Sequence, residues 1–426
     1  MPAQEPNYKG KEMGIVVVNS LDSVTLKVKE YSVPDLKNVT KSSSNVKITP
    51  TTLSANFKSQ VAYVPKNTAK IKKIFTVWDK FYINYQDGSV FAVNENDELL
   101  VSYVWGSGDY TIVPVLFKGE KSALIIERGE RAEVVGGLDI TSVDIPAAEH
   151  YLTLGYLFFI AGGNFLSYTS SPELLDFKGD ITFPLDSGKI TGLAALGKKL
   201  VVVCEFAVYV VTAFGEAEDY VVTRLATISN ATVNGTVIRV LDSVVFTDGE
   251  HLYSFNGKSL DKIAVAGGLN GYEIDGVASV DNDCYVLPLV KDGEKYLFRH
   301  GFNDNSDAFI NVQNNAVTNG YAVVGGNVVT ICESEQGEPL EMGEWESALM
   351  DFGATGKKTL AQISATVQGK VDITVGKTSG SKTFNFNTKS VVKRPNYTAN
   401  GFVFTARGKD FTLKNLNLKY TEKGVN

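Results

Sequence analysis

The sequence of 426 residues contains little cysteine, histidine or tryptophan, with three of each. Cys204, Cys284 and Cys332 lie in apolar runs and have no metal-like spacing, so we expect small core residues rather than disulfides or ligands. No run reaches the roughly 18 apolar residues that span a bilayer. The N-terminus also lacks the basic and apolar regions of a signal peptide. These absences predict a chain made in a reducing compartment, with no membrane span.

Helical periodicity is also missing, since no 3.6-residue pattern persists beyond about two turns. The sequence contains instead a series of apolar hairpins whose turns centre near positions 87, 119, 162, 205, 248, 292 and 325. Their spacings are 32, 43, 43, 43, 44 and 33 residues. A recurrent spacing near 43 residues in β-rich sequence is typical of a β-propeller, and seven hairpins predict about seven blades over residues 61–345. The alternative is a pair of β-sandwiches, which has no reason to keep such a period.

The two flanking regions have different patterns. Residues 1–60 begin polar and predict an N-terminal extension, an arm with one or two edge strands that closes a sheet or wraps a neighbour. Five strand-like runs joined by Gly, Asn and Lys turns predict a C-terminal β-sandwich over residues 346–426. We therefore expect an all-β protein whose C-terminal domain is separable, so that limited proteolysis within residues 337–343 releases it.

The net charge of −7 is unevenly distributed. Residues 346–426 contain 13 Lys and Arg against 5 Asp and Glu, residues 1–60 contain 8 against 5, and residues 61–345 contain 20 against 38. One interpretation is an acidic solvated surface with lysines that protect strand edges. The other is that the basic C-terminal part faces an acidic surface on a neighbouring copy or on another protein. The acidic middle argues against sequence-specific nucleic-acid binding, because phosphate contacts need clustered Lys and Arg.

Motifs for catalysis are scarce. The segments 353–359 and 375–378 resemble phosphate loops superficially, but neither has the G-x-x-x-x-G-K-[ST] spacing or a following helical pattern, so we interpret them as hairpin turns. His150, His251 and His300 occur singly, without the spacing of a metal site. No G-x-S-x-G elbow occurs.

A propeller glycosidase needs two carboxylates around a central pocket. Candidate carboxylates are plentiful, although most lie at expected turns, where Asp caps its own backbone. They are Asp79, Asp109, Asp180, Asp186, Asp248, Asp281 and Asp283. We predict that the protein is not an enzyme, with no catalytic, cofactor-binding or metal-binding residues and no cofactor.

One order of motifs within residues 156–262 resembles a known family. An apolar-aromatic strand precedes a Tyr-Ser-x-Pro segment, an Ile-Thr-Gly-Leu entry leads into a second apolar strand, and a later hairpin ends in Gly257. The matching positions are Leu157–Phe159, Tyr168, Pro172, Phe177, Ile190–Leu193, Leu200–Val203, Tyr209 and Val244–Gly257. This order, with the segment DFGATGKKTLAQISATVQGKVDITV near the C-terminus, resembles the propeller proteins in the neck and tail of tailed bacteriophages. These are the packaged-DNA stabilisation, tail tubular and nozzle proteins, and the resemblance covers about two thirds of the chain.

The resemblance implies a structural virion protein, made in the host cytoplasm and located in the neck or tail of the particle. It would form a homo-oligomeric ring around the DNA exit channel and contact portal, adaptor or other tail proteins, while genome DNA passes through the channel. The first alternative is a tail propeller that binds carbohydrate on the host surface, and the second is a propeller glycosidase.

Overall fold

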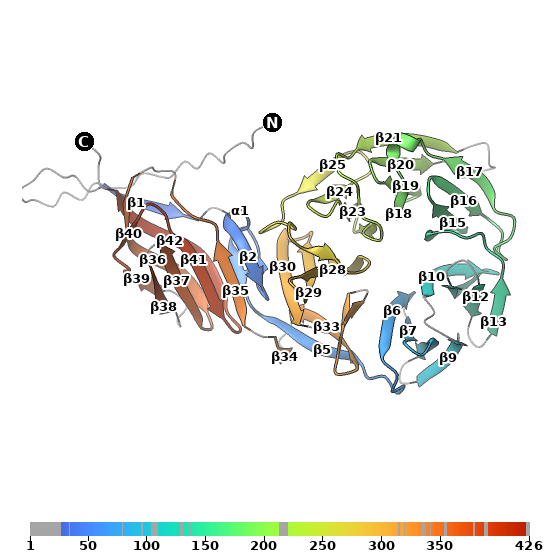
Figure 1. Cartoon of the computed structure of the whole chain (residues 1–426), viewed down its shortest axis with the longest axis horizontal. Coiled ribbons are helices and arrows are strands. Elements are labelled where there is room, and N and C mark those ends of the chain that lie inside the picture. The colour runs from blue at the N-terminus through green and yellow to red at the C-terminus, as the bar shows by residue number, and fades with distance from the viewer. Residues whose placement is uncertain are drawn as a thin grey trace, which may run out of the picture.

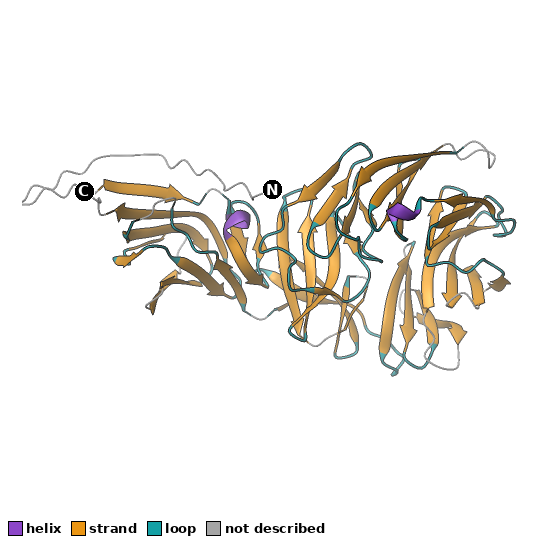
Figure 2. Ribbon diagram, turned by 45° about the horizontal axis from the view of Figure 1, so that its top comes forward, coloured by secondary structure: helices purple, strands orange, loops and turns teal. Residues whose placement is uncertain are grey.

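The computed structural model describes residues 27–33, 35–78, 80–94, 97–103, 110–127, 131–136, 139–212, 220–313, 316–318, 320–333, 337–340, 342–352, 356–377, 380–386 and 391–422. The described chain is almost entirely β-structure (Figure 1). Its two helices are the single turns α1 (Leu36–Val39) and η1 (Leu185–Ser187), drawn in purple in Figure 2. No helix among the described residues has the length and apolar character needed to cross a membrane.

Five four-stranded antiparallel sheets follow one another along the chain. The first has β6 (Ile71–Val77), β7 (Lys80–Tyr85), β8 (Ser89–Asn94) and β9 (Asp97–Tyr103). The second has β10 (Tyr110–Phe117), β11 (Glu120–Glu127), β12 (Arg131–Gly136) and β13 (Asp139–Val143). The third has β14 (His150–Leu154), β15 (Leu157–Gly162), β16 (Phe165–Thr169) and β17 (Lys178–Thr182). The fourth has β18 (Ile190–Leu196), β19 (Lys199–Cys204), β20 (Ala207–Thr212) and β21 (Val221–Thr227), and the fifth has β22 (Ile238–Val240), β23 (Ser243–Thr247), β24 (Leu252–Phe255) and β25 (Leu260–Ile263).

Two further sheets complete this part of the molecule, which we call the seven-sheet unit. The sixth is formed by β26 (Glu273–Ile274), β27 (Ser279–Asp281), β28 (Cys284–Lys291), β29 (Glu294–Gly301) and β30 (Ser306–Gln313). The seventh has β31 (Ala316–Thr318), β32 (Tyr321–Val324), β33 (Asn327–Glu333), β34 (Glu338–Pro339) and, from far earlier in the chain, β5 (Phe57–Tyr63). Strand β5 pairs with β33, so the seventh sheet ties the start of the unit to its end.

The seven sheets are arranged in chain order around a common centre (Figure 1). Strands β6, β10, β14, β18 and β22 each contact the next in this order, β22 contacts β27, and β31 contacts both β29 and β6. Seven hydrophobic clusters lie between neighbouring sheets of the described chain, and the last joins the seventh sheet to the first through Val328, Ile74 and Ile83. Each sheet therefore buries both of its faces against its two neighbours.

The seven hairpins expected from the sequence are confirmed. Paired strands flank each of the seven turns, from β7 and β8 at the first to β32 and β33 at the last. The expected turn near 119 joins the first two strands of its sheet. Five of the others join the second and third strands, and the turn in the sixth sheet joins β28 and β29, after β26 and β27, which both pair with β28. The difference of one strand at the turn near 119 explains why the spacing before it is only 32 residues.

The remaining strands form two sheets packed over one core, which we call the terminal unit. One sheet has the order β2 (Thr40–Ser44), β35 (Gly343–Ser347), β41 (Val403–Gly408), β37 (Val371–Lys377) and β38 (Gly380–Phe386). The other contains β4 (Thr52–Ser54), β42 (Thr412–Glu422), β36 (Lys358–Gln368) and β39 (Val391–Lys393), with β1 (Lys27–Ser32) on β42 and β40 (Tyr397–Ala399) on β36. Their shared core contains Trp345, Ile373 and Phe404 from the first sheet and Leu360 and Leu418 from the second.

The described N-terminal strands belong to the sheets of the terminal unit. Strand β2 is the edge strand of its sheet, and β1, β2 and β4 pair with β42 and β35. A boundary at residue 60 also divides β5. These partners lie more than 280 residues away along the chain, so no local pattern indicates them. Residues 1–26 lie outside the described residues.

The two units share one continuous sheet. Strand β3 (Lys47–Ile48) pairs with β30 of the sixth sheet on one side and with β4 of the terminal unit on the other. Backbone hydrogen bonds therefore run from the sixth sheet through β3 and β4 to β42 and β36, in a sheet of twelve strands. The junction is therefore formed by paired strands.

The turn between β36 and β37 contains Gly369, whose φ of +74° favours glycine. A Cβ at this position would clash with the carbonyl oxygen of Asp410. We expect Gly369→Ala to destabilise the terminal unit by more than the roughly 1 kcal/mol that positive φ costs by itself. Gly293→Ala is the matched control, because Gly293 has a φ of +80° but open space where its Cβ would lie. Equal shifts of the thermal midpoint in the two variants would contradict the expected clash.

Candidate functional site

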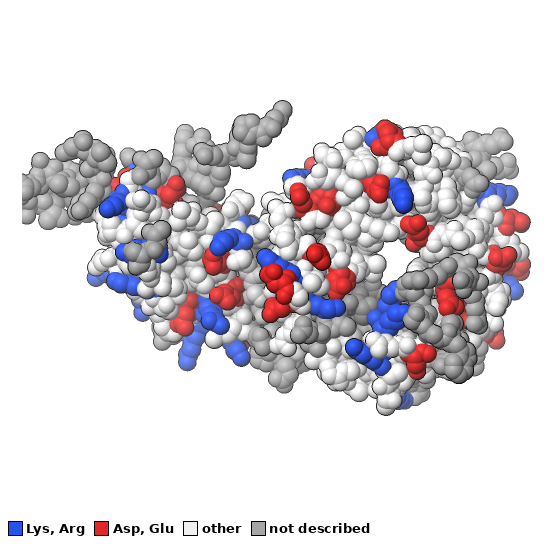
Figure 3. Space-filling model, in the orientation of Figure 1, with Lys and Arg blue, Asp and Glu red and all other residues white. Residues whose placement is uncertain are grey.

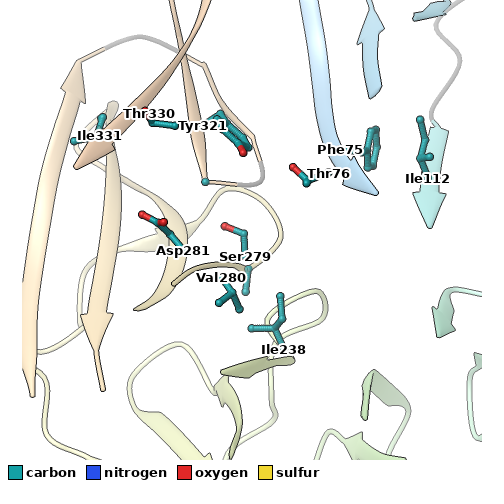
Figure 4. A pocket seen from close by; sticks show the side chains of 12 residues that line it. Phe75, Thr76, Ile112, Ile238, Ser279, Val280, Asp281, Tyr321, Thr330 and Ile331 are labelled. Atoms are coloured by element: carbon teal, nitrogen blue, oxygen red, sulfur yellow. The ribbon is translucent and has the colours of Figure 1, made fainter. Parts of the chain in front are cut away.

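A cavity of about 400 Å³ lies at the centre of the seven-sheet unit (Figure 4). We call it the axial cavity. It is lined by Phe75, Thr76, Ile112, Ile238, Ala278, Ser279, Val280, Asp281, Gly320, Tyr321, Thr330 and Ile331. These residues come from the first, second, fifth, sixth and seventh sheets, so the cavity depends on the arrangement of the sheets and not on one segment.

Asp281 is the only acidic residue on the described wall of this cavity. Its Oδ2 accepts a hydrogen bond of 2.6 Å from Nη2 of Arg299. Nη1 of the same guanidinium donates to the carbonyl of Ile331 at 3.0 Å, and the Arg299 side chain is only 13% exposed. Burial, the largest single influence, lowers the pKa of Arg299, but Asp281 and Cys284 together raise it overall. The Arg299 cation therefore lies directly against the Asp281 carboxylate on this wall.

A second, more polar pocket of about 330 Å³ adjoins the axial cavity and shares Asp281 and Thr330 with it. Lys47 on β3 lies here, 2.8 Å from Asp304 and 2.7 Å from Glu333. Burial opposes the charge on Lys47, yet the hydrogen bonds to the two carboxylates raise its pKa overall. Lys47, on the strand that joins the two units, thus forms ion pairs with two carboxylates of the seven-sheet unit.

The second contact between the units is more deeply buried. Nζ of Lys37, on α1, lies 2.8 Å from Oδ2 of Asp307, and their side chains are 4% and 0% exposed. Oδ1 of Asp307 lies 2.7 Å from Nδ1 of His300, and Oδ2 accepts a hydrogen bond from the backbone N–H of Ala266. A buried ion pair with its remaining hydrogen bonds satisfied fixes the relative position of the groups that make it.

The three histidines are separate, and each contacts a different group. His150 Nε2 lies 3.0 Å from the carbonyl of Ile190, and burial lowers the pKa of this imidazole. His251 Nδ1 lies 3.0 Å from Oδ2 of Asp248 in a turn of the fifth sheet, and His300 contacts Asp307. No group of three or more His, Cys, Asp or Glu that could hold a metal ion occurs among the described residues.

Four of the seven candidate carboxylates have side chains that the structure describes, and two of these, Asp281 and Asp283, both line the polar pocket. Asp186 pairs with Arg224, Asp248 accepts hydrogen bonds from Tyr253 and its own turn, and Asp283 accepts one from the backbone N–H of Asn303. Of the four described side chains, only that of Asp281 lies on the axial cavity. Asp79, Asp109 and the side chain of Asp180 lie outside the described part.

The remaining motif residues lie in or beside strands. Val375–Lys377 belong to β37, and residues 353–355 and Thr378 lie outside the described part.

The three cysteines are free. Burial raises the pKa of the Cys204 thiol to about 12, in keeping with a core residue, whereas Cys284 and Cys332 are partly buried on the wall of the polar pocket.

Charge is distributed unequally between the two units. Residues 27–54 and 343–422, which span the terminal unit, contain 17 Lys and Arg against 8 Asp and Glu. Residues 57–340, which span the seven-sheet unit, contain 21 against 36. The structure thus joins the two basic ends of the sequence into one basic unit.

The basic residues gather at the edge of the terminal unit that contains β37, β38 and β39 (Figure 3). Lys377 and Lys382 lie over the same Tyr397 ring, with Nζ 4.3 and 5.3 Å from its centroid. Lys393 lies over Phe386, and Arg394 beside it is exposed. We call these four cations the basic edge. None of them forms an ion pair with a described residue.

Acidic side chains gather at the opposite end of the long axis, over the second and third sheets (Figure 3). We call this surface the acidic end. In the second and third sheets and their connections the exposed carboxylates include Asp139, Asp144, Glu149, Glu173 and Asp176, alongside the exposed Lys118, Lys121 and Lys178. Of these, Glu173 has a long contact of 3.8 Å with Lys118.

Comparison with known proteins gives little further information. No protein-family model and no curated protein matches the chain. Among solved structures, it is similar to PorZ, described as an essential bacterial surface component of the type-IX secretion system of Porphyromonas gingivalis. The identity is 11% and the TM-score 0.41, over 78% of this chain and 46% of PorZ. The chain therefore corresponds to less than half of that protein, and a similarity of this size carries no conclusion about fold or function.

Proposed function

We propose that the protein is a structural component of a tailed-bacteriophage particle that assembles head to tail into a ring in the neck or tail. In this proposal the seven sheets are the blades of a β-propeller and the terminal unit is a β-sandwich. The observation that carries the proposal is the opposite charge of the two units of one chain. The order of motifs in residues 156–262 supports the location in the particle.

The physical argument begins with the basic edge. Two ammonium groups contact one aromatic ring there without a described carboxylate partner, so this edge carries unbalanced positive charge. An acidic surface would balance this charge, and the acidic end of a second copy presents one. The two surfaces differ, so the contact would be heterologous, and heterologous contacts form closed rings when the rotation between copies closes.

Rigidity is the second requirement of a ring. The continuous sheet through β3 and the buried Lys37–Asp307 pair hold the basic edge at a fixed distance from the acidic end. A fixed distance gives every copy the same angle to its neighbour. The axial cavity has only the size of a small-molecule site, so a DNA channel would have to lie between copies and not through one chain.

Charge reversal tests the contact. We expect Lys382→Glu with Arg394→Glu to weaken self-association by about tenfold or more, measured by mass photometry over a range of salt concentrations. Lys258→Glu with Lys262→Glu is the matched control, because both lysines are exposed but lie in the fifth sheet, away from both ends. Adding Asp139→Lys and Asp144→Lys to the first variant should restore association. Equal behaviour of variant and control would contradict the proposed contact.

Electron microscopy of the purified chain tests the assembly itself. A closed ring of copies is the expected result. A chain that stays monomeric and binds neither portal nor adaptor subunits would exclude the structural role in the particle, whatever the charge variants do.

A further inference from the structure

The axial cavity has a feature that assembly does not explain. Phe75, Ile112, Ile238, Val280 and Ile331 border it from five different sheets (Figure 4), with Ile112 and Ile331 themselves buried in the clusters between sheets. Val280 remains 39% exposed although it lies at the centre of the unit. An apolar wall facing a cavity of this volume is typical of a site that a small molecule covers.

Polar groups stand on the same wall. The Asp281 carboxylate is held by Arg299, and Tyr321, Thr330 and Thr76 add hydroxyl groups. The Tyr321 ring is itself positioned by an edge-to-face contact with Phe81, with centroids 5.3 Å apart. The buried hydroxyl of Ser279 has no hydrogen-bond partner among the described residues.

The charge of the wall indicates the kind of ligand. Because Arg299 balances Asp281, the wall offers no net attraction to a cation, and the carboxylate disfavours an anion. Neutral ligands with hydroxyl groups fit better, since each hydroxyl can donate to Asp281 and accept from the hydroxyl of Thr76 or Tyr321, whereas Thr330 donates to the carbonyl of Gln60. Their C–H faces would pack on the Phe75 and Tyr321 rings.

We propose that the axial cavity binds a neutral sugar ring, either as a free monosaccharide or as the terminal residue of a glycan. A pyranose combines apolar C–H faces with hydroxyl edges, which matches the mixed wall. The cavity volume of about 400 Å³ accommodates one or two such rings. This binding is independent of the head-to-tail assembly proposed above.

Saturation-transfer NMR and calorimetry on the full chain test the proposal. The probes are neutral hexoses, N-acetylhexosamines and their short oligosaccharides, with glucuronate and choline as charged probes. We expect saturable binding of at least one neutral sugar, with a dissociation constant on the order of 1 mM for a single ring, and no saturable binding of the charged probes. Tighter binding of the oligosaccharide than of its terminal monosaccharide would identify a glycan end, and equal binding a free sugar.

Two variants test whether the axial cavity is the binding site. Val280→Trp fills the axial cavity and should abolish binding, and Tyr321→Phe, which removes only a hydroxyl, should weaken it by about fivefold or more. Val324→Trp is the matched control, because Val324 is 41% exposed and does not line the cavity, so it should bind normally. A folded chain that binds no neutral sugar, that binds the charged probes equally well, or that keeps its binding in Val280→Trp would overturn the proposal.

Discussion

Asp307→Asn is expected to lower the free energy of unfolding by about 3–5 kcal/mol, the cost of leaving one member of a buried ion pair without its partner. The Lys37 ammonium would remain 4% exposed beside a neutral amide. Its other described contact, the side-chain oxygen of Asn305 at 2.8 Å, carries no charge to balance it. Equilibrium denaturation followed by fluorescence measures the loss, and Trp345, buried in the core of the terminal unit, reports on the unit that the pair attaches.

Two further variants separate the buried charge from a general effect of substitution. Asp275→Asn breaks the exposed pair between Asp275 and Lys295, whose side chains are 41% and 33% exposed, and should cost no more than about 1 kcal/mol. Lys37→Met combined with Asp307→Asn removes both buried charges and should recover most of the lost stability. If Asp307→Asn cost no more than Asp275→Asn, the Lys37–Asp307 pair would not hold the two units together.

The second large effect concerns cleavage of the chain within residues 337–343. The sequence suggests that such a cut releases the C-terminal domain, whereas the strand pairing leads us to expect that both fragments stay together. After the cut, β1, β2 and β4 of the N-terminal fragment still pair with β42 and β35 of the C-terminal fragment. The fragments should elute as one species in size-exclusion chromatography and separate only in denaturant.

Deletion of residues 1–56 gives the complementary result. It removes Leu36, Val46, Ile48 and Leu53, each no more than 1% exposed, from the core of the terminal unit. Burial of each such side chain contributes about 1.5–3 kcal/mol, so the shortened terminal unit should not fold. Loss of soluble protein, or of Trp345 burial, is the expected readout. A shortened chain with a folded terminal unit would show that β1–β4 are dispensable there.

The sequence located the local elements well. All seven expected hairpins are present, because a hairpin is determined by its own turn residues and by the apolar pattern of the two strands beside it. The turn at Asp292-Gly293, flanked by β28 and β29, is an example. The five strands expected after Trp345 correspond to β36, β37, β38, β41 and β42 for the same reason.

The axial cavity could not be identified from local sequence. Asp281 was one of seven carboxylates in turn-like sequence, and nothing local distinguishes it from Asp283, two residues away. What distinguishes it is the position of Arg299 on β29 and of Ile331 and Tyr321 in the seventh sheet. The axial cavity consists of residues from five sheets, so it exists only when all of them are in place.

The sequence by itself determined an all-β chain, its hairpins and the sign of charge along it. The tertiary structure decided that β5 completes the seventh sheet, that β1–β4 belong to the terminal unit, and that Lys37 meets Asp307. The reason is physical. Hairpin pairing depends on turn geometry within a few residues, whereas pairing between residues about 270 to 390 positions apart depends on which apolar faces remain uncovered once the local sheets have formed.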